Sequence, residues 1–233
     1  MKLKMAVLGL LAACAFSASA TTTVTGTFDG GGRSYGTACD GASESQQPVF
    51  LLKDGATLQN VVINKNAADG VHCEGSCNIN NVVWQDVCED AATMKGGSGK
   101  IMRVRGGSAA NASDKVFQHN GKGSTVSIDG FKTTGSIGKL YRSCGNCSSN
   151  GGPRKLNVAN VQLEKVMASV AGVNSNYGDV ATIRSVKIKG YKSGSPEVCV
   201  EYKGVQKGSD SPKIGEKWGT TACNVRKSDV TAY

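Results

Sequence analysis

Short apolar runs rich in valine and isoleucine recur along most of this chain at a regular interval. Each run ends in a polar or glycine-rich corner, and the central apolar residues of successive runs are about 21 to 31 residues apart. Such a chain can form a solenoid, in which each period is one coil and equivalent residues stack from coil to coil. The runs are Val49–Leu52 with Ala56–Ile63, Cys77–Trp84, Lys100–Val104, Ser124–Ile128, Lys155–Val161 and Ala181–Val186.

The composition favours strands over helices. No segment of ten or more residues places apolar side chains with a 3.6-residue period. The 31 glycines suit a chain with many corners, and the Val, Ile, Asn and Gly content suits narrow coils. The sequence therefore predicts an all-β fold, a right-handed single-stranded parallel β-helix with coils of about 21–25 residues. A β-sandwich is the alternative, whereas a leucine-rich repeat lacks its recurring leucines.

The first twenty residues predict export. Lys2 and Lys4 precede an uncharged apolar run, and Ala18–Ala20 is a small-residue cleavage signature, so residues 1–20 are predicted to be a signal peptide. A membrane anchor is the alternative, but the run is too short to span about 30 Å of hydrocarbon. No later segment is long and apolar enough to span a bilayer. We therefore expect a secreted, extracellular protein without a membrane partner.

Eight cysteines remain once Cys14 leaves with the signal peptide. An even number in an exported chain predicts four disulfides, although the sequence does not decide their pairing. A zinc site is the alternative for the closely spaced pairs. We expect residues 21–193 to form the catalytic β-helix domain and residues 194–233 to form a disulfide-tethered cap. The eight are Cys39, Cys73, Cys77, Cys88, Cys144, Cys147, Cys199 and Cys223.

Acidic residues recur at nearly the same point of the period. Asp69 precedes Asp90 by 21 residues, Glu89 is beside Asp90, and Asp114 follows 24 residues later. Stacked coils would gather these carboxylates, and a hard cation such as Ca²⁺ is the usual reason to hold carboxylates together. An aspartate before glycine is also an ordinary turn residue, which is the alternative for Asp69 alone. The spacing therefore predicts a Ca²⁺ site at Asp69, Glu89 and Asp90.

Basic residues lie at or just after the successive corners. Stacking would align Lys95, Lys115, Lys139 and Arg142 in a strip beside the acidic cluster, although isolated lysines are more often only solvated. Removing Lys2 and Lys4 lowers the formal charge from +9 to +7, so the exported chain remains basic and is attracted to polyanions. It lacks nucleic-acid-binding motifs and has few aromatic residues for stacking bases. These features disfavour nucleic acid, but charge alone does not choose among an acidic polysaccharide, an anionic membrane and extracellular nucleic acid.

Four segments, PVFLLKDGATLQNVVI, ADGVHCEGSCNINNVVWQDVCEDAATMK, DKVFQHNGKGSTVSI and GKLYRSCGNC, resemble the pectate lyases of polysaccharide lyase family 3. The resemblance covers about residues 21–193. It implies a secreted, monomeric enzyme of plant cell-wall degradation that cleaves de-esterified polygalacturonate by Ca²⁺-dependent β-elimination, giving 4,5-unsaturated products. It implies Ca²⁺ ligands at Asp69, Glu89 and Asp90. It also implies cleft residues, which are Lys95, Lys115, Lys139, Arg142 and Glu44.

The base that removes the C5 proton of the sugar is expected to be Arg142, with Lys115 as the second candidate. Both are strong bases, so the sequence predicts a rate optimum above neutral pH. His72 is expected to be packed and hydrogen-bonded, and His119 is ambiguous. One alternative function is a polygalacturonase-type hydrolase that uses a carboxylate pair such as Asp90 and Asp114. The other is a non-catalytic pectin-binding protein.

Overall fold

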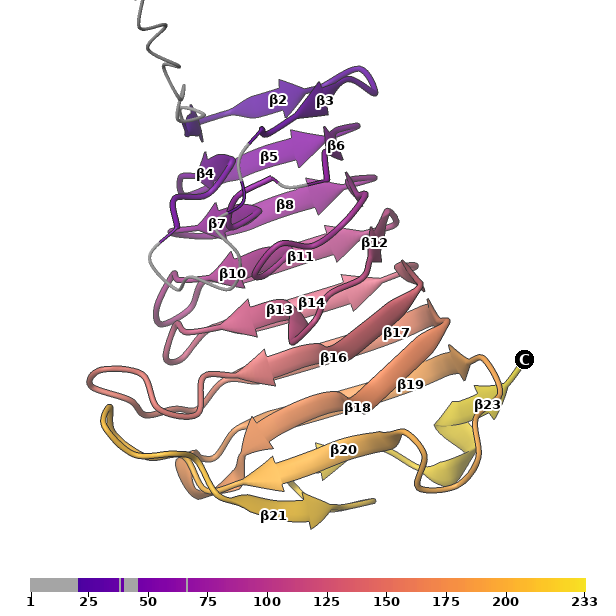
Figure 1. Cartoon of the computed structure of the whole chain (residues 1–233). Helices are drawn as coiled ribbons and strands as arrows, with labels where there is room; N and C mark the ends of the chain where they lie inside the picture. The colour runs from indigo at the N-terminus through magenta and orange to yellow at the C-terminus, as the bar shows by residue number, and fades with distance from the viewer. Residues whose placement is uncertain (1–20, 38, 40–45, 66) are drawn as a thin grey trace, which may run out of the picture.

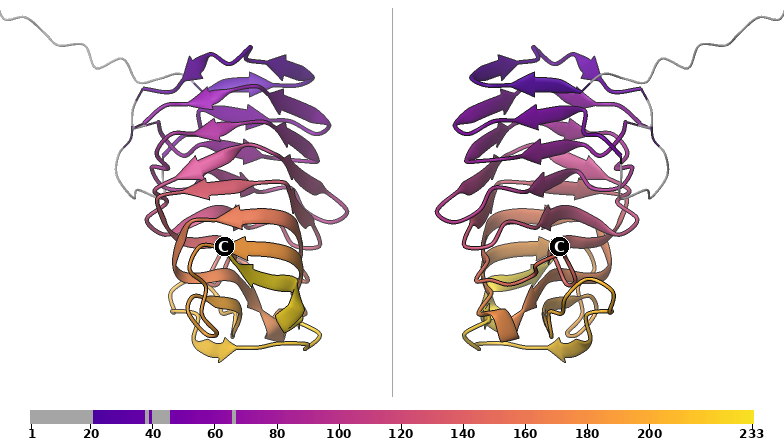
Figure 2. Two further views of the ribbon diagram at one scale, coloured as in Figure 1. Left: turned by 90° about the vertical axis from the view of Figure 1, so that its right-hand side faces the viewer. Right: turned by 90° about the vertical axis from the view of Figure 1, so that its left-hand side faces the viewer.

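The chain winds into a parallel β-solenoid, whose coils stack in chain order from the indigo N-terminal end to the yellow C-terminal end (Figure 1). The computed structural model describes residues 21–37, 39, 46–65 and 67–233. Views from two further sides show the same stack of coils (Figure 2). The predicted all-β parallel β-helix is confirmed, and the predicted signal peptide lies outside the described residues.

One sheet takes one strand from each coil. Within the described residues it has nine strands, all paired in parallel except the last, which pairs antiparallel with its neighbour. This sheet carries the candidate site described below. In spatial order its strands are β1 (Thr22–Val24), β4 (Phe50–Leu52), β7 (Val71–Cys73), β10 (Ala92–Met94), β13 (Lys115–His119), β16 (Ser136–Ser143), β18 (Lys165–Asn174), β20 (Glu197–Tyr202) and β21 (Lys213–Glu216).

The second sheet runs around the rest of each coil. Most early coils contribute two short strands to this sheet. The long strand β17 pairs with both short strands of the coil before it, β14 and β15, so the later coils contribute one long bent strand each. Within the described residues the strands of this second sheet are β2 (Thr27–Asp29), β3 (Ser34–Tyr35), β5 (Ala56–Gln59), β6 (Val62–Ile63), β8 (Cys77–Asn80), β9 (Val83–Trp84), β11 (Ile101–Arg105), β12 (Ser108–Ala110), β14 (Thr125–Asp129), β15 (Lys132–Thr134), β17 (Lys155–Leu163), β19 (Val180–Ile188), β22 (Cys223–Asn224) and β23 (Val230–Ala232). Two three-residue 3₁₀ helices, η1 (Ser175–Tyr177) and η2 (Lys227–Asp229), complete the described elements.

The apolar residues of the sequence period form one inward-facing ladder. Each is paired in register with the next, and each is at most 2% exposed. Burying one such side chain stabilises the fold by roughly 1.5–3 kcal/mol. A shift of one coil against the next would expose these side chains, so their repeated interval sets the register of the coils. The ladder consists of Leu58, Ile79, Val104, Ile128, Val158 and Ile183.

The corners of the second sheet need a left-handed backbone. Asn60, Asn81 and Asn160 have φ values of 52°, 51° and 54°, a region that asparagine tolerates better than most residues. The Asn81 side chain donates to Asn60 Oδ1 at 3.0 Å, so the corners of adjacent coils are also tied together. The asparagines of the repeat therefore have a structural role on this face.

The eight cysteines form four disulfides, so the zinc alternative is wrong. They are Cys39–Cys88, Cys73–Cys77, Cys144–Cys147 and Cys199–Cys223. The last joins two residues of the C-terminal segment, whose strands are themselves paired into both sheets of the solenoid. Among the residues described, no helix is long and apolar enough to cross a membrane.

Candidate active site

Three carboxylates gather where the chain enters strands β7 and β10. One oxygen from each of Asp69, Glu89 and Asp90 lies within 4.8 Å of the others, and the residues are 7%, 7% and 3% exposed. The pairing of Val71 with Ala92 places the residues before these two strands on adjacent coils. A Cβ at Gly70 would lie 2.2 Å from the Ala91 carbonyl oxygen. The glycine after Asp69 therefore lets the two coils approach closely at the cluster.

Burial and the closeness of the three acids disfavour the charged form of Asp90 in this cluster. Burial raises the pKa of Asp90 well above its usual range, and the neighbouring Glu89 and Asp69 add to this effect against the attraction of Lys115. Asp69 Oδ1 is buried without a hydrogen-bond partner, and Asp90 Oδ1 has an ion pair with Lys115 Nζ at 3.3 Å. A buried acceptor without a partner costs about 1–3 kcal/mol, and hard carboxylate oxygens suit Ca²⁺. The donor set therefore fits the cation that the sequence predicts.

His72 contacts the cluster directly. Its Nε2 lies 2.6 Å from Asp69 Oδ2, and both side chains are buried. A histidine bonded to a metal-binding carboxylate fixes the orientation of that carboxylate. The sequence predicts only a packed, hydrogen-bonded histidine, because the strand-like run around it gives no sign of its partner. The spacing of three residues from Asp69 is the one signal that could have indicated this contact.

Lys115 lies between the carboxylates of two successive coils. Its Nζ is 3.2 Å from Glu89 Oε1, 3.3 Å from Asp90 Oδ1 and 3.0 Å from Asp114 Oδ2. Burial by itself lowers the pKa of Lys115, but the charges of the three carboxylates outweigh burial and raise it. The ammonium form is therefore strongly favoured while these contacts persist.

Asp114 links the two lysines of the site. Lys139 pairs in register with Lys115, and Lys139 Nζ lies 2.5 Å from Asp114 Oδ1. Burial alone would raise the pKa of Asp114, but its hydrogen bonds and ion pairs with the two lysines lower it. The carboxylate is therefore held in its charged form between two cations. The sequence marks Asp114 by its position in the period but does not assign it this linking contact.

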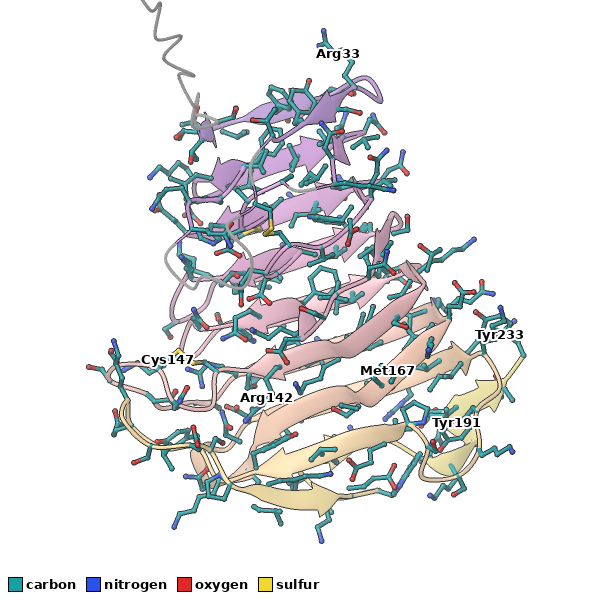
Figure 3. All side chains as sticks on the ribbon, viewed as in Figure 1. Arg33, Arg142, Cys147, Met167, Tyr191 and Tyr233 are labelled. Carbon is teal, nitrogen blue, oxygen red and sulfur yellow. A yellow bond between two sulfur atoms is a disulfide. The ribbon has the colours of Figure 1, made fainter. Side chains whose placement is uncertain are left out.

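Arg142 lies further along β16 than Lys139, opposite Gln118 of β13. Figure 3 shows it beside the loop that carries Cys147. Burial lowers the pKa of Arg142, partly against the effect of the nearby tyrosines and Asp179. A cleft of about 550 Å³ brings Arg142 together with Lys115 and Lys139. The structure thus places three of the four predicted basic residues in one cleft.

Of the remaining two predicted residues, the structure describes only Lys95. Lys95 follows the end of β10 and lines an adjoining pocket of about 450 Å³ with Lys122 and Arg154, instead of the cleft that holds Lys115. The two pockets share Asn120 and the loop around Cys147. Glu44 lies outside the described residues. The predicted strip of basic residues is therefore divided between the cleft and the adjoining pocket.

The fold and the site together define a β-solenoid protein that places a cation-binding cluster beside a basic cleft. A family model described as "Pectate lyase" matches residues 12–209. The chain is 44% identical over 213 residues to "Probable pectate lyase E" of Neosartorya fischeri, covering 90% of this chain and 80% of that protein. It is 46% identical over 209 residues to "Pectate lyase E" of Emericella nidulans, covering 88% and 79%.

Solved structures agree with these sequence relatives. Pectate lyase PelI from Erwinia chrysanthemi matches with a TM-score of 0.85 and 49% identity, covering 91% of this chain and 70% of that one. A structure of PelI in complex with tetragalacturonic acid matches with a TM-score of 0.84 at the same identity and coverage. The chain therefore belongs to the pectate lyase family, and the resemblance to polysaccharide lyase family 3 is confirmed. The protein is an enzyme, a polysaccharide lyase.

Proposed function

We propose that this enzyme is exported and cleaves de-esterified polygalacturonate by Ca²⁺-dependent β-elimination. The observation that carries the proposal is the buried Asp69, Glu89 and Asp90 cluster, in which Asp69 Oδ1 lacks a hydrogen-bond partner, beside a cleft lined by Lys115, Lys139 and Arg142. The relative solved with tetragalacturonic acid supports the choice of substrate. The four disulfides support an oxidising, extracellular location.

The residues that would hold the cation are Asp69, Glu89 and Asp90, with His72 fixing the orientation of Asp69. A bound Ca²⁺ supplies Lewis-acid stabilisation of charge on the sugar carboxylate as the C5 proton leaves. Lys139 lies at the cleft and offers an ammonium that can pair with a carboxylate of the polymer. The carboxylates of the polymer would thus meet positive charge both from the cation and from Lys139.

Arg142 is the better candidate for the base. The pKa of Lys115 is raised by three carboxylates, which disfavours proton removal by its amine, whereas burial lowers the pKa of Arg142. In the proposed step the C5 proton passes to a guanidine nitrogen of neutral Arg142, which becomes a guanidinium. The electron pair of the C5–H bond forms the C4–C5 double bond, the C4–O bond breaks with its electrons on oxygen, and that oxygen takes a proton from water. The rate should therefore rise above neutral pH, as more Arg142 loses its proton.

The carboxylates of this site are not arranged for a hydrolase mechanism. The carboxylates of Asp90 and Asp114 are both bound to the ammonium of Lys115, at 3.3 Å and 3.0 Å. A hydrolase needs one carboxyl group that donates a proton and one that activates water or attacks the sugar. With Lys115 between them, neither carboxylate is free for that work.

The test is incubation with polygalacturonate, followed by ultraviolet absorbance of the unsaturated product and by a reducing-end assay. We expect absorbance that a calcium chelator abolishes and that added Ca²⁺ restores. Reducing ends without absorbance would identify a hydrolase. Tight binding of the polymer with neither signal would identify a pectin-binding protein without activity.

A further inference from the structure

The guanidinium of Arg142 is enclosed by residues from three other parts of the chain. Nη1 donates to Ser143 O at 2.5 Å and to Asn174 Oδ1 at 3.0 Å, and Nη2 donates to Ser211 Oγ at 3.1 Å. The centre of the guanidinium lies 3.9 Å from the centroid of the Tyr202 ring. Tyr202 and Ser211 belong to the segment after residue 193, which the sequence predicts to be only a cap. Two of the four contacts therefore come from outside the predicted catalytic domain.

Two glycines make the space for this arrangement. Arg142 pairs in register with Gly172 of β18, where a Cβ would lie 2.8 Å from Arg142 Cδ and 3.0 Å from Tyr202 Cε2. A Cβ at Gly145 would lie 2.8 Å from Arg142 Nη2 and 2.7 Å from Ser211 Cβ. The side chains of Arg142, Tyr202 and Ser211 thus fill the space that a side chain at Gly145 or Gly172 would need.

The C-terminal segment is itself fixed to the wall of the cleft. Val205 N donates to Gly145 O at 2.8 Å, and Asn146 Nδ2 donates to Ser209 O at 3.1 Å. Asn150 N donates to Gln206 Oε1 at 2.9 Å. These bonds join residues 205–209 to the loop closed by the Cys144–Cys147 disulfide. Because both segments line the cleft, the position of Ser211 is set by the cleft wall and not by a free tail.

We propose that Tyr202 is a positioning residue that holds the Arg142 guanidinium in the catalytic cleft, and that residues 197–212 belong to the catalytic unit. The proposal rests on the proposed function for its consequence in catalysis. The flat Tyr202 ring, 3.9 Å from the guanidinium centre, restricts the planes in which the side-chain group of Arg142 can lie, both in its charged form and in the neutral form that acts as base. Without the ring, Arg142 keeps its hydrogen-bond acceptors but loses the surface that orients it. The loss should therefore appear in kcat more than in KM.

The main experiment compares Tyr202→Leu with Tyr202→Phe, the conservative variant that keeps the ring. We expect Tyr202→Leu to lower kcat on polygalacturonate by roughly tenfold with KM changed by less than about threefold, and Tyr202→Phe to restore most of the loss. Ser211→Ala, a change in a loop that cannot unfold a strand, should lower kcat by about twofold to fivefold. Lys213→Ala, which breaks an exposed ion pair with Glu197 in the same segment, is the matched control.

A second readout does not depend on activity. In ¹⁵N-labelled protein the Arg142 side-chain NH signal, assigned with Arg142→Lys, should be shifted upfield by the Tyr202 ring current in wild type and Tyr202→Phe. The shift should disappear in Tyr202→Leu. Wild-type kcat together with an unshifted signal in Tyr202→Leu would overturn the positioning role. A wild-type protein that shows the shift but makes no unsaturated product would support the contact and refute the proposed function instead.

Discussion

Among the buried acids in the described part of the chain, Asp179 and the Asp69, Glu89 and Asp90 cluster differ in how their carboxylate oxygens are satisfied. Asp179, 1% exposed, accepts the Arg154 backbone N–H at 2.7 Å on Oδ1 and the Asn174 backbone N–H at 3.1 Å on Oδ2. Asp69 is similarly buried, yet its Oδ1 has no hydrogen-bond partner, and it lies in a cluster with the buried Glu89 and Asp90. Asp69 and Asp179 each lie next to a glycine in the sequence, so this local context does not distinguish them.

The difference separates a structural acid from one that is available to a ligand. A carboxylate that receives several backbone hydrogen bonds is satisfied inside the protein and stabilises the chain around it. A cluster of carboxylates with unsatisfied oxygens opposes folding and gains most from a bound cation. Mutations at the two sites should therefore affect different properties. The Asp90 cluster should control activity, and Asp179 should control stability.

The largest expected effect is the loss of activity in Asp90→Asn. Removing one of three ligand charges should lower kcat/KM on polygalacturonate by about three orders of magnitude, equal to about 4 kcal/mol. The stability of the chelator-treated variant should not fall, because the cost of burying the Asp90 charge and its repulsion from Glu89 and Asp69 outweigh the attraction of Lys115 that the substitution removes. Initial rates and thermal unfolding measure the two quantities, with the exposed Asp54→Asn as control. Near wild-type activity in Asp90→Asn would refute the Ca²⁺ site.

Asp179→Asn should show the opposite pattern. Its amide group would place a donor against the N–H groups of Arg154 or Asn174, and we expect unfolding to become easier by about 3 kcal/mol. Chemical denaturation measures this loss, and a calcium titration of the folded variant should give the wild-type affinity. If the calcium affinity falls as much as the stability, the two acidic sites are coupled and do not have separate roles.

His119 is a buried titratable residue of another kind. Both of its ring nitrogens have hydrogen-bond partners while the ring is uncharged. Its ring bonds Tyr141 Oη and Ser124 Oγ at 2.7 Å, and burial, with the nearby Arg154, lowers its pKa to about 3. The unfolded chain takes up the proton at about pH 6.5, so stability falls as the pH drops below that value. The loss should reach about 2 kcal/mol at about pH 5. Denaturation midpoints of wild type and His119→Gln across this range measure it, and equal slopes would contradict the assignment.

The smallest expected effect concerns the partner of Asp69. His72→Phe keeps the ring but removes the atom 2.6 Å from Asp69 Oδ2. The apparent affinity for Ca²⁺ should fall about tenfold, equal to about 1.4 kcal/mol, because the ligand is no longer oriented. The calcium dependence of the melting temperature reports this change without any substrate. An unchanged calcium dependence would leave His72 as a packing residue only.

The sequence alone determined the repeating part of this protein. The apolar interval fixed which residues stack, as the ladder from Leu58 to Ile183 shows, and the same interval brought Asp69 onto the coil next to Asp90. Lys115 and Lys139 followed in the same way, since they are one period apart and pair in register. These features are predictable because a solenoid converts a constant separation in sequence into a constant displacement in space.

Only the tertiary structure decided the contacts that do not repeat. It placed Lys95 in a pocket separate from Lys115, paired the cysteines, and brought Tyr202 and Ser211 against Arg142. Arg142 and Ser211 are 69 residues apart, and the loops between them follow no period. Their meeting depends on side-chain packing and on hydrogen bonds between two irregular loops. Local spacing carries no information about such contacts, because irregular chain paths are chosen by the whole fold.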